Sequence, residues 1–70
     1  MSLAKKVKML LILREMTMTQ LAEKLDTSPQ NLGNKLSRDN LSEKDLLEIA
    51  EALNCDFEAT FTLRDTGKTI

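Results

Sequence analysis

Residues 17–36 read TMTQLAEKLDTSPQNLGNKL, and this stretch decides the fold because it holds two closely spaced helix starts. Thr17 stands three residues before Gln20, which is the spacing of a capping box. Ser28 precedes Pro29, whose missing N–H would be unpaired at the first helical position anyway. The helices that these caps predict cover residues 18–25 and 29–37.

The two predicted helices share an apolar face built from leucine. The leucines recur at helical spacing on either side of the turn, at Leu21, Leu25, Leu32 and Leu36. Ala22 supplies a small side chain where the helices would cross closely. A tight turn between two such helices is the geometry of a helix-turn-helix, in which the second helix enters the major groove of DNA.

The flanking segments predict one further helix on each side of this pair. Before it, residues 3–15 carry apolar side chains at helical spacing, and the stretch Met9–Leu13 is apolar on nearly every side. Such a helix needs cover from more than one direction, and the neighbouring helices would supply only one. After the pair, Ser42 stands three residues before Asp45 as a cap, which predicts a helix over residues 43–53.

The end of the chain follows a different pattern. Residues 56–64 alternate polar and apolar side chains, which predicts a half-buried β-strand. Its apolar side consists of Phe57, Ala59, Phe61 and Leu63. Asp65–Lys68 then predicts a turn, after which Thr69 and Ile70 fold back briefly.

A single strand cannot pair all of its own backbone groups. The economical partner is the same strand of a second copy, running antiparallel about a two-fold axis. We therefore expect the apolar side of residues 56–64 to form a dimer interface, and the resulting sheet to cover Met9–Leu13 from its second side. The alternative is a strand that forms a hairpin only with its own last residues.

Composition excludes several classes of function. Seventy residues hold one core, and the chain has one cysteine, Cys55, and no histidine, which excludes a Cys/His zinc site and histidine-based catalysis. Without a glycine-rich phosphate loop either, we expect no enzyme activity, no metal and no cofactor. The longest apolar run is too short to span a bilayer and the N-terminus lacks a signal-peptide pattern, so we expect a cytoplasmic protein without membrane contact. Cys55 is expected to be a small core residue.

The net charge of −1 hides an asymmetry along the chain. Residues 1–40 carry seven basic and four acidic side chains, a net +3, whereas residues 41–70 carry three basic and seven acidic ones, a net −4. A polarised molecule can present a basic face to DNA although its total charge is close to zero. A solvated surface without a partner would explain the same asymmetry, so charge alone does not decide.

Residues 3–54 resemble the Cro/repressor-type helix-turn-helix family, the small transcription regulators of phages and bacteria. The positions that carry the resemblance are Thr17, Leu21, Ala22, Leu25, Ser28 and Leu32, followed by Leu46, Ile49, Ala50 and Leu53. The resemblance implies a mainly α fold, a four-helix lambda-repressor-like bundle over residues 1–54, with residues 55–70 as a C-terminal β-strand arm that pairs in a dimer. Asp26 stands where the family usually has glycine in the left-handed conformation, which Asp tolerates.

The same resemblance makes the second helix of the motif the one that reads DNA. Base contacts are expected from Gln30, Asn31 and Asn34, whose amides can donate and accept on an adenine edge. Phosphate contacts are expected from Thr17, Thr19, Ser28, Lys35, Arg38, Asn40 and Lys44. Gly33 lowers helix stability, and a close approach to DNA would explain its presence.

These features together predict a homodimeric, sequence-specific DNA-binding transcriptional regulator, expected to act as a repressor on double-stranded DNA. The alternative is a protein-interaction or antitoxin-like module that keeps the fold with weak or no DNA binding. The acidic balance of the chain favours that alternative slightly. Met18 favours it as well, because many relatives place a glutamine that reaches DNA at this position.

Overall fold

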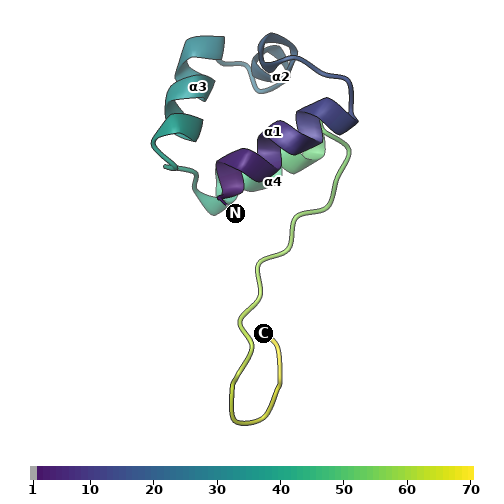
Figure 1. Ribbon diagram of the computed structural model, residues 1–70, viewed down its shortest axis with the longest axis vertical. Coiled ribbons are helices and arrows are strands. Elements are labelled where there is room, and N and C mark those ends of the chain that lie inside the picture. The colour runs from purple at the N-terminus through teal and green to yellow at the C-terminus, as the bar shows by residue number, and fades with distance from the viewer. Residues whose placement is uncertain (1) are drawn as a thin grey trace.

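The computed structural model describes residues 2–70, which form a bundle of helices with an extended C-terminal segment projecting from it (Figure 1). The helices are α1 (Leu3–Leu13), α2 (Met18–Lys24), α3 (Pro29–Ser37) and α4 (Glu43–Ala52). All four predicted helices are confirmed, and each ends within two residues of the expected position. Across residues 2–70, no helix has both the length and the apolar character needed to cross a membrane.

Each helix begins at a hydroxyl side chain that accepts a hydrogen bond from the backbone N–H three residues later. The caps are Ser2, Thr17, Ser28 and Ser42, with oxygen-to-nitrogen distances of 3.1 to 3.2 Å. At Thr17 and Ser42 the capping box is complete, because the side chains of Gln20 and Asp45 accept the N–H of the cap in return. A cap of this kind contributes about 1 kcal/mol, so the helix starts follow from the local sequence.

The four helices also end in a common way, at a non-glycine residue in the left-handed conformation. These residues are Glu15, Asp26, Asp39 and Asn54, with φ angles from 52° to 57°. The following residue donates its N–H to the carbonyl five residues earlier, as Thr27 does to Ala22 at 3.0 Å. This bond satisfies a carbonyl that the helix leaves unpaired. Asp26 therefore takes the conformation expected from the sequence.

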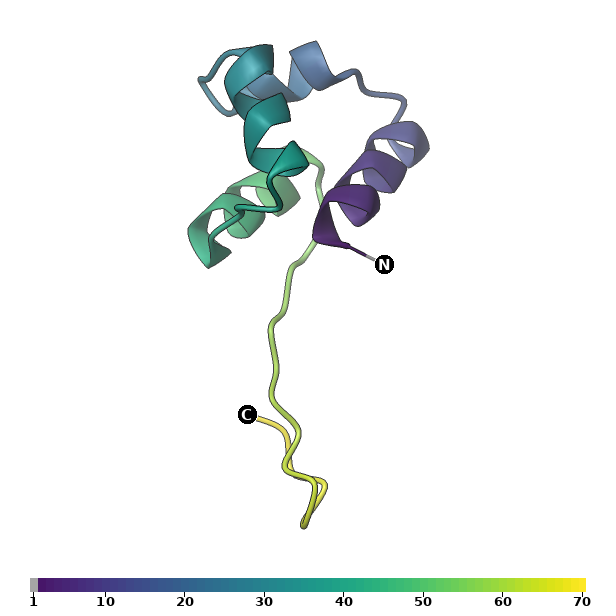
Figure 2. The same ribbon diagram turned by 60° about the vertical axis from the view of Figure 1, so that its left-hand side comes forward.

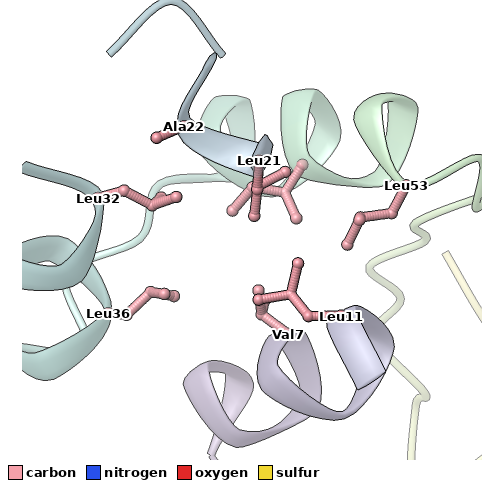
Figure 3. Packing of buried hydrophobic residues seen from close by; sticks show 8 residues of the cluster. Val7, Leu11, Leu21, Ala22, Leu32, Leu36 and Leu53 are labelled. Carbon is pink, nitrogen blue, oxygen red and sulfur yellow. The ribbon is translucent and has the colours of Figure 1, made fainter. Parts of the chain in front are cut away.

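The core is aliphatic and receives side chains from all four helices (Figure 3). Its buried residues are Val7, Leu11, Leu21, Ala22, Leu32, Leu36, Ile49 and Leu53. Leu21 lies at the centre and is 0% exposed. Leu25, expected on the same apolar face, is only half-buried, and Cys55, expected in the core, packs half-buried against its edge. Neither Phe57 nor Phe61 belongs to this core.

Arg14 ties the end of α1 to the end of α4. Its Nε donates to the carbonyl oxygen of Leu53 at 2.9 Å, and a terminal guanidinium nitrogen donates to that of Asn54 at 3.0 Å. Both carbonyls lie at the C-terminal end of α4, where acceptors lack partners within the helix and positive charge is favoured. The bundle is therefore closed at the point where the C-terminal segment leaves it (Figure 1).

The C-terminal segment extends away from the bundle instead of packing along it (Figure 2). No strand is present among residues 2–70, so the predicted β-strand over residues 56–64 is unconfirmed. A strand requires a hydrogen-bonded neighbour, and residues 56–60 find none within the described chain. The outward side of Met9–Leu13 also remains exposed, because no element of residues 2–70 covers it from the second side that the sequence predicts.

The tip of the segment does fold back on itself. Phe61 and Ile70 exchange two hydrogen bonds of 2.8 Å, next to an antiparallel bridge between Thr62 and Thr69. Gly67, with a φ of 76°, provides the left-handed residue of the turn. The predicted turn and the brief return of the last residues are therefore confirmed.

Candidate nucleic-acid interface

The helices α2 and α3 form the helix-turn-helix predicted from the sequence. Only residues 25–28 separate the end of α2 from Pro29 at the start of α3. Leu21 of α2 and both Leu32 and Leu36 of α3 point into the core (Figure 3). Because the buried residues of α3 lie on one side of the helix, its opposite side faces solvent.

The outward side of α3 carries a line of exposed polar side chains. They follow helical spacing, and we refer to them as the α3 stripe: Gln30, Asn34, Ser37 and Arg38. Within residues 2–70, the side-chain hydrogen bonds of α3 and its cap involve only Ser28 and Lys35. The side chains of the stripe therefore have no hydrogen-bond partner there. Ser37 was not among the predicted contacts, although its spacing of seven residues from Gln30 could have indicated it.

Asn31 is exposed as well and borders the stripe, three residues before Asn34 and seven before Arg38. It lines a shallow hollow together with two acidic residues, Glu23 of α2 and Asp26 of the turn. Two carboxylates at this position repel a phosphate backbone. Of the three predicted base contacts, Asn31 is therefore the one with acidic neighbours, because Gln30 and Asn34 do not line this hollow.

Lys35, a predicted phosphate contact, forms an ion pair within the chain. Its Nζ lies 3.1 Å from Oδ1 of Asp45 in the first turn of α4. The backbone N–H of Ser42, and after it the Lys35 ammonium, holds the pKa of Asp45 below its ordinary value of 3.8. Because the Lys35 side chain is 51% exposed, this pair contributes little stability, and the ammonium can leave Asp45 for a phosphate at small cost.

The other predicted phosphate contacts lie on more than one side of the bundle. The hydroxyl oxygens of Thr17 and Ser28 act as helix caps. Thr19 in α2 and Asn40 after α3 are exposed. Lys44 lines a hollow formed by α2, α4 and the turn between α2 and α3, to which α3 itself contributes no residue. Lys44 was expected to contact phosphate beside α3, but it lines a surface to which α3 does not contribute.

Gly33, in the middle of α3, has no steric reason for being glycine within the chain. A Cβ atom added there would meet nothing within 4 Å. Alanine at a helix-interior position is favoured over glycine by about 1 kcal/mol. Packing therefore does not account for Gly33, whereas a partner approaching α3 closely would.

The surface of the bundle carries exposed side chains and one larger hollow. Residues 2–70 contain no cluster of His, Cys, Asp and Glu able to hold a metal ion. A hollow of about 660 Å³ between α2 and α4 is lined by lysines and carboxylates together with leucine and alanine. The exposed side chains of α3 are suited to recognising a partner.

A comparison with known protein families identifies the same region. A family model described as a Cro/C1-type HTH DNA-binding domain matches residues 6–61 of the chain. The matched region contains the whole of α2, α3 and α4 and extends into the C-terminal segment as far as Phe61. No curated protein and no solved structure gives a significant match.

Proposed function

The chain belongs to the Cro/C1-type helix-turn-helix DNA-binding family, and on this basis we propose that it is a sequence-specific transcriptional regulator acting as a repressor. The observation that carries the proposal is the α3 stripe, whose side chains are exposed and polar and make no side-chain hydrogen bond within residues 2–70. In a helix-turn-helix, the second helix presents such a face to the base edges of the major groove.

The chemistry of the stripe suits direct reading of bases. Gln30 and Asn34 each carry an amide that can donate and accept on an adenine, and Arg38 carries a guanidinium that can pair with guanine. Four residues of helix span about 6 Å, which is close to the rise of two base pairs. Gln30 and Asn34 are therefore spaced to contact different base pairs, while Asn31 contributes from the flank.

Contacts to phosphates would set the position of α3 in the groove without reading sequence. The candidates are the hydroxyls of Thr17, Thr19 and Ser28, the cations of Lys35, Arg38 and Lys44, and the amide of Asn40. Each cation that neutralises a phosphate releases a counterion, so affinity falls as salt rises. We expect a modest salt slope, because Lys35 already has a partner in Asp45 and Lys44 lies away from α3.

The proposal includes a homodimer formed through residues 56–64 of the C-terminal segment. Phe61 and Leu63 direct their backbone groups toward the returning residues of the hairpin. Backbone groups alternate in direction along an extended chain, so Thr60 and Thr62 direct theirs to the opposite edge, which has no partner in the chain. An antiparallel strand from a second copy can add to this open edge. The self-hairpin and the dimer are therefore compatible.

The proposed dimer interface is the apolar side of the segment. It comprises Phe57, Ala59, Phe61 and Leu63, and Phe61 is 82% exposed in the single chain. We expect sedimentation to give a mass of twice 7.9 kDa, and Phe61→Asp to reduce it to that of one chain. A wild-type mass of one chain at high concentration would contradict the dimer. A symmetric dimer would place two copies of α3 about 34 Å apart, one turn of DNA.

Fluorescence anisotropy with labelled random-sequence duplex DNA tests the DNA-binding function itself. We expect binding at low salt that weakens as salt is added, and selective enrichment of particular sequences from the pool. Substitution Arg38→Ala should weaken binding, whereas Asp65→Ala, in the exposed turn of the hairpin, should leave it unchanged. Failure to bind any duplex at low salt would contradict the proposal and favour a protein-interaction module that has kept the fold.

A further inference from the structure

The outer face of α1 carries an apolar cluster that the rest of the chain leaves uncovered. Val7 and Leu11 point into the core (Figure 3). Helical spacing and exposure place Met9, Ile12 and Leu13 on the outer side of the helix. Ile12 is 76% exposed, Leu13 75% and Met9 49%. Contiguous exposed apolar side chains of this size mark a contact surface. The cluster and the lysines N-terminal to it on α1, namely Lys5, Lys6 and Lys8, are called here the α1 outer face.

The C-terminal segment lies on a different side of α1. Where it leaves the bundle, Phe57 lines a hollow with Leu3 and Leu10 of α1 and with Ile49 of α4. None of the three residues of the apolar cluster lines that hollow. The hollow at the base of the C-terminal segment therefore does not cover the apolar cluster, and the cluster stays open to a partner.

A surface of complementary character lies between α4 and the end of α2. It is a hollow of about 660 Å³. Its apolar lining comes from Leu25, Leu47 and Ala52, and its charged lining is acidic on balance, with Asp26, Glu48 and Glu51 against Lys24 and Lys44. Glu43 adds a further carboxylate to the exposed residues of α4. We call this surface the α2–α4 hollow.

The two surfaces lie on opposite sides of the bundle. Val7 and Leu11 enter the core from α1, and Leu53 enters it from α4, across from them (Figure 3). The outer sides of α1 and α4 therefore face away from each other. Neither surface includes a residue of α3, so a contact through them leaves the α3 stripe accessible.

We propose that the α1 outer face of one copy docks into the α2–α4 hollow of a second copy. Ile12 and Leu13 fill the apolar part of the hollow, next to Leu47, and the lysines of α1 lie against the acidic side chains of α4. Opposite charge across the contact selects this pairing. Pairing of two α1 outer faces would instead bring together the lysines of both copies, and like charges repel.

A contact between two different surfaces links copies head to tail, in a ring if the rotation between copies closes and in an open row if it does not. The surfaces involved are small beside the 1,200 to 2,000 Å² that roughly defines a stable interface, so the contact is weak between free molecules. It becomes effective when two copies are held side by side, which raises their local concentration. If the chain binds DNA as proposed above, the contact makes occupation of adjacent sites cooperative. The contact itself does not depend on DNA.

Disulfide trapping tests the pairing directly. In a Cys55→Ser background, one protein carries Ile12→Cys and a second carries Leu47→Cys, and both replaced side chains are exposed, so both proteins fold. We expect the mixture to form several-fold more disulfide-linked dimer than either protein alone. If the Ile12→Cys protein links to itself as readily as the mixture does, α1 pairs with α1 and the proposal is wrong. Equally low trapping in all three samples overturns it as well.

Charge reversal provides a matched control for the same experiment. Lys5→Glu with Lys8→Glu, placed on the Ile12→Cys protein, should reduce trapping several-fold, and so should Glu48→Lys with Glu51→Lys on the Leu47→Cys protein. Combining the two reversed proteins should restore trapping, because the charges are again opposite. A yield of disulfide-linked dimer that neither charge reversal changes would contradict the electrostatic basis of the contact. Neither experiment contains DNA, so a negative result leaves the proposed function untouched.

Discussion

The bundle of residues 2–54 and the C-terminal segment of residues 55–70 differ in what becomes of their apolar side chains. In the bundle, leucines from four helices bury one another, and Leu21 and Leu53 are at most 1% exposed. In the segment, Leu63 and Ile70 are exposed, and Phe61 is 82% exposed. The core of the bundle is therefore filled by the chain itself, whereas these apolar side chains of the segment stay exposed in the single chain.

The largest difference between the two regions should appear in stability. Leu21→Ala removes the central core side chain and should lower the free energy of unfolding by about 3 to 5 kcal/mol, enough to unfold a domain of this size. Phe61→Ala, a larger truncation in the segment, should leave the stability of the monomer unchanged. Urea unfolding at low protein concentration measures both. A concentration-independent loss in Phe61→Ala would mean that the segment packs on its own bundle.

DNA affinity should separate the residues of α3 from one another. Gln30→Ala and Asn34→Ala should each weaken binding to a selected sequence by about 1 to 3 kcal/mol, because each removes a paired contact to a base. Asn31→Ala is the matched control on the same helix, and its effect should be smaller since Asn31 lies beside Glu23 and Asp26. Anisotropy titrations measure the three. An Asn31→Ala effect that exceeds the other two would show that α3 enters the groove in a different rotation.

Both regions contain a hydroxyl side chain that accepts a nearby backbone N–H, at Ser42 in the bundle and at Thr66 in the segment. Ser42→Ala removes the cap of α4 and should cost about 1 kcal/mol of stability. Thr66→Ala removes a similar bond at the tip of the segment, where Oγ1 accepts the N–H of Lys68 at 3.2 Å, and should have no effect on unfolding of the bundle. Thermal melts followed by circular dichroism report both. Equal losses would mean that the segment unfolds together with the bundle.

Gly33→Ala should move stability and affinity in opposite directions. The added methyl group meets nothing within 4 Å, so the helix should gain up to about 1 kcal/mol of stability. The same methyl group should weaken DNA binding if a base or phosphate approaches α3 at this position. Unfolding and anisotropy measured on one preparation check both effects. Stability gained without loss of affinity would remove the proposed reason for Gly33.

The smallest expected effect is the acid dependence contributed by Asp45. Its pKa is lowered in the folded state, mainly by the N–H of Ser42, so ionised Asp45 stabilises the fold above the ordinary pKa of 3.8. This stabilisation is lost as the pH falls below 3.8 and through the lowered pKa. The stability difference between the wild type and Asp45→Asn should therefore be constant near neutral pH and vanish in acid. A difference that grows on acidification would reverse the assigned direction.

Local signals explain why so much of the bundle could be predicted. Thr17, Ser28 and Ser42 act within three residues of themselves, so their caps are visible in the sequence and appear in the structure. The left-handed conformation of Asp26 is equally local. The two bonds from Arg14 to carbonyls at the end of α4 depend on how distant helices meet, and no short pattern encodes them.

The sequence predicted which residues of α3 are available to the candidate interface, but not which side chains of other helices lie beside them. Helical spacing places Gln30 and Asn34 on one face, whereas the acidic hollow beside Asn31 forms only when α2 packs against α3. The ion pair between Lys35 and Asp45 likewise joins two helices. The C-terminal segment is the part least fixed by local sequence, because an alternating pattern does not supply a pairing neighbour and residues 56–60 have none within residues 2–70.

Selection of binding sites from random-sequence duplex DNA tests the central claim most directly, since it reports on α3 and on the C-terminal segment together. The account predicts an enriched sequence with two-fold symmetry, whose half-sites lie about 10 base pairs apart, one turn of DNA. Phe61→Asp should retain the half-site and lose the spacing. Absence of any enriched sequence at low salt would contradict the assignment of α3 as the element that reads DNA.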